Sequence, residues 1–319
     1  MVLNHCYIGD CRVLLKQFAV AGVSAQTCVT SPPYFGLRDY GVDGQIGLEP
    51  TPAEYVAELV SVLRFVRDIL ADDGTLWLNL GDSYAGSWGA QSHRESSTND
   101  SRVSKDQIKN HPKMAGVKPK DLYGIPWRVA FALQADGWYL RSDIIWHKPN
   151  PMPESVTDRP TKAHEYLFLL AKSQRYYYDA DAIAEQATWD PPNGTQTDSE
   201  KYYEAASGRD DAGRKANGFG FYRSGNSWGP EKRNRRSVWS VTTQPFDGAH
   251  FAVFPRTLIE PCILAGSRVG DVVLDPFMGS GTTAQVAEHL GRQWIGCELN
   301  PAYLPLQKQR IAQRAMVLE

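Results

Sequence analysis

Cysteines are few in this sequence, and they are scattered along it. The 319 residues include five cysteines, at positions 6, 11, 28, 262 and 297, with no Cys-x-x-Cys motif and no pairing with histidine. Structural zinc sites and disulfide frameworks both require cysteines in a regular pattern. The sequence therefore predicts no metal site and no disulfide-stabilised fold.

Long apolar runs and a leader segment are missing as well. No apolar stretch approaches the roughly 20 residues that cross a bilayer as a helix. The N-terminus, Met-Val-Leu-Asn-His-Cys-Tyr, lacks the charged and then apolar segments of a signal peptide. The sequence predicts a protein of the reduced cytoplasm that makes no membrane contact.

Positive charge is not in excess. Lys and Arg number 34 and Asp and Glu number 36, so the net charge is -2. This balance excludes a protein that coats nucleic acid through a uniformly basic surface, and any contact with a polyanion must come from local patches. Residues 83–120 carry seven Lys/Arg and three Asp/Glu, and residues 214–236 carry seven Lys/Arg and one Asp/Glu. A solvated surface loop would explain the first patch equally well.

A short string near the C-terminus carries the most specific information. Residues Asp271–Thr283 read Asp-Val-Val-Leu-Asp-Pro-Phe-Met-Gly-Ser-Gly-Thr-Thr. The apolar run predicts a buried strand that ends at Asp275, and Thr282 begins a predicted helix. Gly279 and Gly281 predict a tight turn between them, where a ligand can approach the backbone and meet the free amides of the helix start.

Two common nucleotide-binding loops are excluded at this turn. No Gly-Lys-Ser/Thr follows the glycines, so nothing is placed to hold a triphosphate. The third glycine of a dinucleotide fingerprint is missing too. A further predicted strand, Gln293–Cys297, ends in Glu298, whose carboxylate can accept hydrogen bonds from both hydroxyls of a ribose. The pattern favours a nucleoside ligand.

Two prolines interrupt the chain at another predicted strand end. The strand Gln26–Thr30 runs into Ser31-Pro32-Pro33-Tyr34. Adjacent prolines stop a strand or helix and remove two amide donors. They leave carbonyl groups at the C-terminal edge, where open α/β sheets bind ligands. Taken alone, the motif would also fit a plain Pro-Pro turn.

Together, the two strings resemble the S-adenosylmethionine-dependent DNA amino-methyltransferases. That family carries Asp-Pro-Phe-x-Gly-Ser-Gly-Thr-Thr at the methionine end of its cofactor and (Asp/Asn/Ser)-Pro-Pro-(Tyr/Phe) as its catalytic tetrapeptide. The catalytic string comes first in this chain and the cofactor loop last, an order that resembles the beta group. The resemblance covers nearly the whole chain. It implies a permuted Rossmann-like α/β fold with a mostly parallel twisted sheet, helices on both faces and an inserted, irregular target-recognition region.

The resemblance also implies the ligands and their sites. It implies S-adenosyl-L-methionine as cofactor and double-stranded DNA as substrate, in a bacterial or phage-encoded enzyme that is associated with the nucleoid. Members of the group often act as homodimers. Asp10, at the end of a predicted strand, is similar to the acid that contacts the cofactor adenine, and residues 250–255 resemble a His-x-Ala-x-Phe-Pro cofactor segment. The implied cofactor-binding residues are Asp10, Phe254, Pro255, Asp275, Pro276, Phe277, Gly279, Ser280, Gly281, Thr282, Thr283 and Glu298.

The chemistry of an amino group on a base suits the implied catalytic tetrapeptide. An exocyclic amino nitrogen is a poor nucleophile because its lone pair is delocalised into the ring. The Ser31 side chain and the Pro32 carbonyl are two acceptors for its protons, and Tyr34 can stack on a base that has been flipped out of the duplex. Positioning and electrostatics then carry most of the catalysis. The implied catalytic residues are Ser31, Pro32, Pro33 and Tyr34.

Predicted strands and helices alternate along the chain outside two irregular segments. Residues 84–120 predict a mobile loop that closes on DNA, and residues 185–245 interleave aromatic and basic side chains. We expect a catalytic half at 1–184, a target-recognition region at 185–245 and a cofactor-binding half at 246–319. Basic side chains can follow phosphates and reach base edges. The expected DNA contacts are Arg223, Lys232, Arg233, Arg235 and Arg236.

Several functions stay open at this point. Serine at position 31 is the family's habit for methylation of cytosine at N4, whereas aspartate or asparagine is usual for adenine at N6. The sequence favours cytosine and leaves adenine as the alternative. A catalytically dead DNA-binding scaffold is a more remote alternative, because it would not need both strings. Methylation of RNA or of protein glutamine is another, although the protein enzymes resemble Asn-Pro-Pro-Tyr and would not need the basic aromatic segment.

Overall fold

A computed structural model describes residues 1–85, 117–186, 232–243 and 254–312. The chain divides into two compact units, one formed by Met1–Ala182 with Arg236–Glu319 and the other by Ile183–Arg235. Most of the predicted loop at 84–120 and of the predicted recognition region at 185–245 lies outside the described residues. The larger unit carries the elements that position the site.

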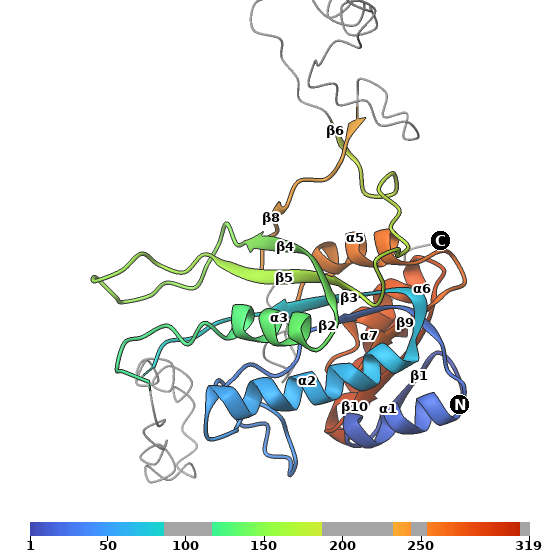
Figure 1. Cartoon of the computed structure of the whole chain (residues 1–319), viewed down its shortest axis with the longest axis horizontal. Coiled ribbons are helices and arrows are strands. Elements are labelled where there is room, and N and C mark those ends of the chain that lie inside the picture. Colours follow the sequence, from blue (N-terminus) through green and yellow to red (C-terminus); the bar gives the residue numbers. More distant parts are fainter. Residues whose placement is uncertain (86–116, 187–231, 244–253, 313–319) are drawn as a thin grey trace, which may run out of the picture. The chain divides into compact units, whose positions relative to one another are not determined.

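The larger unit is built on a sheet with the strand order β1-β10-β9-β2-β3-β5-β4-β8 (Figure 1). Neighbouring strands run parallel except at β5, which is antiparallel to both β3 and β4. The expected mostly parallel α/β sheet is therefore confirmed. The strand bounds are β1 His5–Ile8, β2 Ala25–Thr30, β3 Leu70–Leu80, β4 Tyr139–His147, β5 His164–Ala171, β8 Val238–Ser240, β9 Val272–Asp275 and β10 Gln293–Glu298.

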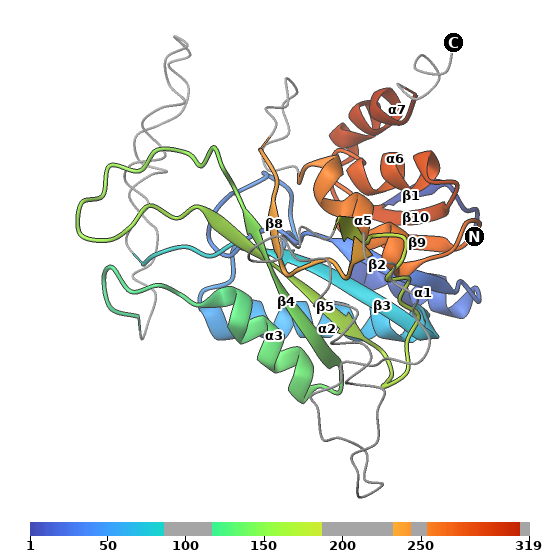
Figure 2. The same ribbon diagram turned by 90° about the horizontal axis from the view of Figure 1, so that it is seen from above.

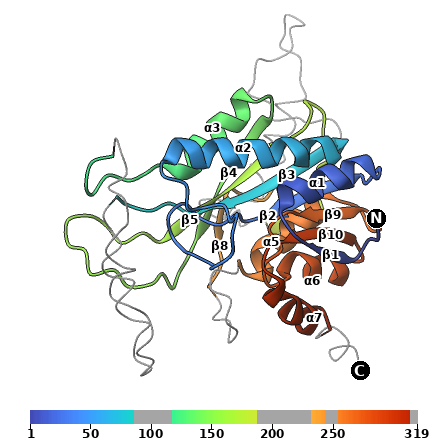
Figure 3. The ribbon, with the colours of Figure 1, turned by 90° about the horizontal axis from the view of Figure 1, so that it is seen from below.

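Helices cover both faces of this sheet. Figure 3 shows α1, α2 and α3 on one face and α5, α6 and α7 on the other, as the resemblance implies, and Figure 2 shows the second group from above. None of the described helices is both long enough and apolar enough to span a bilayer. The helix bounds are α1 Cys11–Val20, α2 Pro52–Ile69, α3 Ile125–Ala135, α5 Arg256–Gly266, α6 Thr282–His289, the 3-10 turn η2 Pro301–Tyr303 and α7 Leu304–Ala312.

Local sequence explains where the longest described helix starts and which side it buries. Thr51 is its N-cap, where the hydroxyl accepts from the Glu54 amide at 3.2 Å and donates to the Glu54 carboxylate at 3.0 Å. Pro52 follows in the first turn, where its missing amide costs nothing. Apolar residues then recur every three to four positions and pack into the core between α1, α2, α3 and the sheet. Helix α2 is therefore a fixed wall beside the end of β2.

Strand β3 begins at Leu70, directly after α2. Leu70 already pairs with Ala25 of β2. The register shifts between Ala25 and Thr27, which is a bulge that absorbs the extra residues. After the shift the pairing is regular up to Thr30 with Leu78, and β3 continues to Leu80, beyond the end of β2.

The smaller unit contains a short two-stranded sheet among its described residues. Strand β6, Glu185–Gln186, pairs antiparallel with β7, Lys232–Arg233. The Arg233 side chain donates to the Glu185 carboxylate at 2.9 Å across this pair. A backbone ladder and an ion pair thus join two segments that are far apart in the sequence.

Candidate active site

A pocket opens in the larger unit at the C-terminal ends of β1, β2, β9 and β10. It is lined by residues from all of the strings that the sequence singles out: the tetrapeptide, the glycine turn and the acids that follow β1 and β10. The predicted site residues that line it are Asp10, Ser31, Pro32, Pro33, Tyr34, Phe254, Asp275, Pro276, Phe277, Gly279, Ser280, Thr282 and Glu298. The structure therefore brings together segments from the start and the end of the chain.

Three predicted cofactor residues stand behind this lining. Gly281 is the N-cap of α6 with a left-handed φ of 86°, so it shapes the turn where a side chain would be strained. Pro255 is the N-cap of α5, whose first helical residue is Arg256. Thr283 points its hydroxyl at Asp275 at 2.6 Å. Their contribution to the pocket is indirect.

Asp275 joins the two specific strings. Its Oδ1 accepts from the Thr30 hydroxyl at 2.6 Å and from the Phe277 amide at 3.0 Å, and its Oδ2 accepts from the Thr283 hydroxyl at 2.6 Å. The side chain is 1% exposed. Burial raises the pKa of Asp275 to about 6, against the effect of the three donors. Because Thr30 immediately precedes Ser31, this carboxylate holds the tetrapeptide against the cofactor loop.

Glu298 sits where the sequence places it, at the end of β10. Its two oxygens accept from backbone amides, one from Asn300 at 2.8 Å and the other from Gly279 at 2.7 Å. Burial raises its pKa, and these amides oppose the rise. Each oxygen keeps a lone pair that a ribose hydroxyl can use. The carboxylate thus supports the glycine turn while it faces the pocket.

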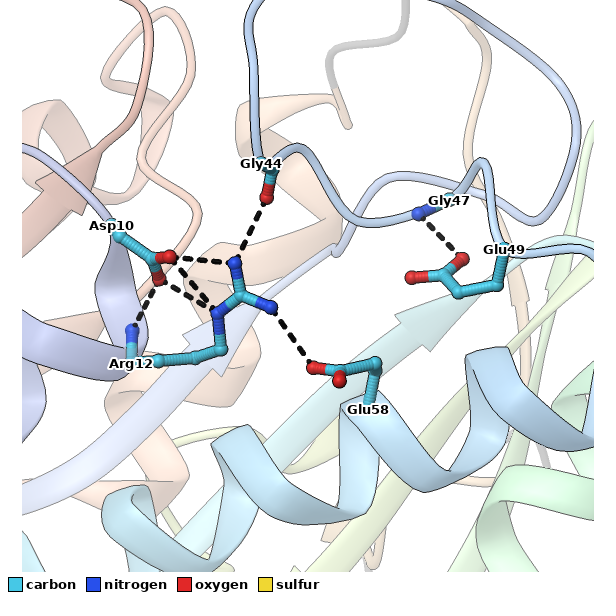
Figure 4. Close-up of polar contacts among 6 residues, drawn as sticks. All are labelled: Asp10, Arg12, Gly44, Gly47, Glu49 and Glu58. Carbon is cyan, nitrogen blue, oxygen red and sulfur yellow. Dashed lines mark hydrogen bonds and ion pairs between the residues drawn. The ribbon is translucent and has the colours of Figure 1, made fainter.

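Asp10 is held by a neighbouring arginine that the sequence does not suggest. Asp10 caps α1 by accepting from the Arg12 amide at 2.8 Å, and the Arg12 guanidinium binds both Asp10 oxygens at 2.6–3.0 Å. Burial opposes ionisation of Asp10, but the bonds from Arg12 outweigh it and lower the pKa of Asp10. Figure 4 shows the same guanidinium reaching the Gly44 carbonyl, at 3.0 Å, and Glu58, at 3.1 Å.

The segment after the tetrapeptide forms a wall of the pocket that sequence reasoning missed. The contact of Arg12 with Gly44 fixes this segment to the end of β1, and Glu49 folds back to accept from the Gly47 amide at 2.9 Å (Figure 4). The glycines are the sequence signal of a loop here, but they do not show what the loop covers. Its lining residues are Leu37, Tyr40, Val42, Gly44, Gln45 and Ile46.

The tetrapeptide is fixed from the helical side by Tyr55 of α2. Its hydroxyl donates to the Pro33 carbonyl at 2.8 Å, and the whole residue is buried. This bond occupies the Pro33 carbonyl and so separates its role from that of the Pro32 carbonyl. The prediction that Pro32 supplies the acceptor is compatible with this arrangement.

Tyr34 lies between the pocket and a polar cluster. Its hydroxyl donates to Glu165 at 2.6 Å and lies 3.2 Å from the Asn79 side-chain oxygen. Gly81 packs against the ring, and a Cβ at that position would stand 2.4 Å from a ring carbon. Glu165 also pairs with Lys148. No motif in the sequence assigns a role to Asn79, Lys148 or Glu165.

The C-terminal helix α7 braces the glycine turn. The Gln307 side chain donates to the Gly279 carbonyl at 2.8 Å. Arg310 donates to the Ser280 hydroxyl at 2.6 Å and also to the hydroxyl of Thr282. Sequence reasoning gave this helix no part in the site, since nothing local links it to a turn some 30 residues earlier.

The predicted DNA contacts are only partly described. Arg223 lies outside the described residues. Lys232 and Arg233 form β7 of the smaller unit, which also contains Arg235, and Arg236 begins the returning segment of the larger unit. No group of His, Cys, Asp and Glu in the described part of the chain has the arrangement of a metal site. Each of the five cysteines is a buried thiol.

The pocket fits the cofactor that the resemblance implies. Two buried carboxylates, Asp275 and Glu298, favour a ligand that carries positive charge, and S-adenosylmethionine carries it on its sulfonium and ammonium groups. The turn at Gly279 and Gly281 admits close backbone approach, and aromatic rings such as that of Tyr40 provide apolar walls. Acids, apolar walls and a glycine turn are what a charged nucleoside requires.

Known proteins with similar sequences are DNA methyltransferases. A family model described as DNA methylase matches residues 25–309 of this chain. The Type II methyltransferase M.SmaI of Serratia marcescens is 46% identical over 317 residues, which cover 98% of this chain and 92% of that protein. The Type II methyltransferase M.Cfr9I of Citrobacter freundii is 45% identical over 303 residues, which cover 95% of this chain and 86% of that protein.

Solved structures share the fold. PvuII DNA methyltransferase, described as cytosine-N4-specific, aligns with a TM-score of 0.59 at 19% identity, covering 96% of this chain and 85% of that one. A putative DNA modification methylase of Thermus thermophilus, solved in complex with S-adenosyl-L-methionine, aligns with a TM-score of 0.55 at 25% identity, covering 98% of this chain and 94% of that one. The chain belongs to the DNA methylase family, whose members use S-adenosyl-L-methionine to methylate the N4 amino group of cytosine or the N6 amino group of adenine.

Proposed function

We propose that this protein is a site-specific DNA methyltransferase that transfers a methyl group directly to N4 of cytosine. The observation that carries the choice of base is Ser31, which opens the tetrapeptide where adenine enzymes of the family usually have an acid or amide. Methylation of adenine at N6 by the same mechanism is the alternative, because both bases present the same kind of amino group.

Each part of the pocket has a role in this proposal. S-adenosylmethionine supplies a methyl group made electrophilic by its sulfonium sulfur. Asp275 and Glu298 hold the turn that receives the cofactor, through the bonds to Phe277 and Gly279 described above. The turn presents the amides at the start of α6, and Asp10 and Glu298 supply acceptors for the nucleoside.

The tetrapeptide acts on the target base. The Ser31 hydroxyl and the Pro32 carbonyl accept hydrogen bonds from the two protons of the amino nitrogen and favour its tetrahedral, attacking form. Tyr34 stacks on the flipped base and keeps the nitrogen in line with the methyl group. Ser31 and Asp275 belong to segments that are joined by the bond between Thr30 and Asp275. The same rigid part of the sheet therefore positions both the attacking nitrogen and the methyl donor. No covalent bond between enzyme and base is needed.

Recognition and biological role follow from other features. The relatives are named Type II methyltransferases, which supports a role beside a restriction endonuclease that reads the same site. We assign target recognition to residues 185–245, with Arg223, Lys232, Arg233, Arg235 and Arg236 as phosphate or base contacts. A homodimer is part of the same proposal, since members of the group often act in that form.

The test is to express the protein in a methylation-deficient host and examine the DNA of that host. Mass spectrometry of the nucleosides identifies the modified base, and single-molecule sequencing gives the site. N4-methylcytosine in one short motif is the expected result. N6-methyladenine would overturn the choice of base and keep the enzyme class. Unmodified DNA, from a host that produces folded protein able to bind the cofactor, would refute the proposed function.

A further inference from the structure

The hydroxyl of Tyr34 is held at the far end of its ring from the backbone. It donates to Oε2 of Glu165 at 2.6 Å, and the Asn79 side-chain oxygen lies 3.2 Å away. Burial raises the pKa of Tyr34 well above its ordinary value, and the Glu165 carboxylate raises it further. The phenol therefore stays protonated at neutral pH and donates to Glu165.

Glu165 is itself fixed by residues from two neighbouring strands. It is the second residue of β5, its side chain is only 15% exposed, and its other oxygen pairs with Lys148, which follows β4. Asn79 of β3 donates to Glu165 at 3.3 Å and to the Tyr166 carbonyl at 3.1 Å. A largely buried carboxylate needs such partners to replace the hydration that it loses. Glu165 is thus a rigid acceptor and not a mobile surface acid.

The flat side of the Tyr34 ring is also confined. Gly81 follows β3, and a Cβ built on it would come within 2.4, 2.8 and 3.1 Å of three ring carbons. The backbone of Gly81 therefore lies against one face of the ring. With one face and the hydroxyl held, the ring keeps one orientation beside the pocket that it lines.

We propose that Glu165 is a positioning residue of the methyl transfer: it anchors the hydroxyl of Tyr34 so that the ring is fixed where the target base stacks. The inference rests on the proposed function, because it assumes that Tyr34 receives the base. Asn79 and Lys148 support Glu165, and Gly81 makes room for the ring. Glu165 neither touches the base nor takes its proton.

The role predicts which contacts matter and which do not. A stacking surface must be held within a fraction of an ångström, since a misplacement of about 1 Å can cost about 100-fold in rate. Truncation of Glu165 frees the hydroxyl, whereas Glu165→Gln keeps a polar group between Lys148 and Tyr34. In that variant the amide oxygen faces the lysine, which can only donate, and the amide nitrogen donates to the tyrosine oxygen. The Asn79 side-chain nitrogen loses its contact at position 165 and keeps its bond to the Tyr166 carbonyl, while the Tyr34 hydroxyl can donate to the Asn79 oxygen. Anchoring without a carboxylate is therefore sufficient if the role is positional.

The experiment measures turnover and cofactor binding in five variants beside the wild type. They are E165A, E165Q, Y34F, the double variant E165A/Y34F, and E288A as a matched control. Glu288 accepts from the ring nitrogen of Trp294 at 2.9 Å and lies outside the pocket, so its loss removes a similar bond elsewhere. Turnover is the transfer of labelled methyl groups to unmethylated genomic DNA with both substrates saturating. S-adenosylmethionine affinity and the melting temperature are measured on the same preparations.

The expected result is a coupled pair. E165A and Y34F should each lower turnover by about 10- to 100-fold with little change in cofactor affinity. The double variant should be no slower than the slower single variant, because both changes remove the bond between Tyr34 and Glu165. E165Q should stay closer to the wild type than E165A, and E288A should match the wild type.

Three results would overturn the inference. One is independent losses that multiply in E165A/Y34F, which would give Glu165 a role apart from Tyr34. Another is E165Q as slow as E165A, which would require the carboxylate itself. The third is wild-type turnover in Y34F. If E165A does not fold, E165Q and Y34F still test the inference: E165Q should turn over faster than Y34F, because its amide still contacts the tyrosine oxygen, and an E165Q variant as slow as Y34F would refute it. A wild type that methylates no DNA would instead refute the proposed function.

Discussion

Replacement of Asp275 by asparagine isolates the free energy of burying one carboxylate. The amide oxygen of Asn can still accept from Thr30 and the Phe277 amide, as Oδ1 of Asp275 does. The amide nitrogen donates to Thr283, whose hydroxyl can turn to the Val29 carbonyl, 3.4 Å away. Because every polar group keeps a partner, we expect Asp275→Asn to fold. The variant lacks only the buried charge.

The magnitude follows from the pKa of this carboxyl. Burial raises it from the ordinary value of 3.8 to about 6 in the folded protein. That difference, at about 1.36 kcal/mol for each pKa unit, corresponds to about 3 kcal/mol. The folded state binds the proton more tightly than the unfolded state, so the stabilising contribution is complete below pH 3.8 and is lost as the pH rises through about 6. Between pH 8 and pH 5 the wild type should gain about 1.4 kcal/mol from this group.

The assay is urea unfolding of both proteins at several pH values from 5 to 8, with tryptophan fluorescence as the signal that monitors unfolding. All other titrating groups are common to the two proteins, so the free energy of unfolding of the wild type minus that of the variant reports Asp275. This difference should rise by about 1.4 kcal/mol as the pH falls from 8 to 5. A difference that stays constant, or that falls, would refute the account of Asp275 as a buried carboxylate with a raised pKa. The variant should also bind S-adenosylmethionine more weakly at pH 8, since a negative charge leaves the pocket.

Two further substitutions test the walls of the pocket. Gly81→Ala should displace the Tyr34 ring, because its Cβ would stand 2.4 Å from a ring carbon. We expect turnover to fall about 10- to 100-fold with cofactor affinity nearly unchanged. Unchanged turnover would show that the ring need not be fixed. Arg12→Met should free Asp10 and the loop at 36–50 and weaken S-adenosylmethionine binding about 10-fold, the equivalent of one charged hydrogen bond. Glu58→Gln touches the same guanidinium on the side away from Asp10 and serves as its control in calorimetry. Equal affinity of the Arg12 variant and its control would contradict the bracing role.

The parts of the site that the sequence predicts are those whose chemistry is local. Gly279 and Gly281 adopt left-handed φ values of 52° and 86°, which only a glycine turn between a strand and a helix explains. Asp275 and Glu298 close β9 and β10 where their strands end, and the paired prolines stop β2. In each case a few neighbouring residues determine the backbone, so the pattern is visible in the sequence.

The parts that sequence reasoning misses depend on contacts between distant segments. Glu165 reads as an ordinary strand residue until the antiparallel pairing of β5 with β3 and β4 brings it to the end of the sheet beside Tyr34. Arg12 reads as a surface cation in the first turn of a helix, and its acceptors at Gly44 and Glu58 lie 32 and 46 residues away. Neither charge nor periodicity distinguishes such residues from solvated ones. They differ only in the residues from distant segments that contact them in the fold.

The bond between Thr30 and Asp275 explains why the order of the motifs along the chain does not matter. The two residues are 245 positions apart, yet β2 and β9 are adjacent strands, and their C-terminal ends meet at one edge of the sheet. In the proposed mechanism, the donor of the methyl group and the acceptor of the amino protons are therefore positioned by a strand pair and one buried carboxylate, whichever string is synthesised first. The chemistry requires that β2 and β9 be adjacent strands, and a permuted chain keeps them adjacent. The catalytic unit that we propose is accordingly the edge formed by β2 and β9, with α2 and β5 holding its outer side through Tyr55 and Glu165.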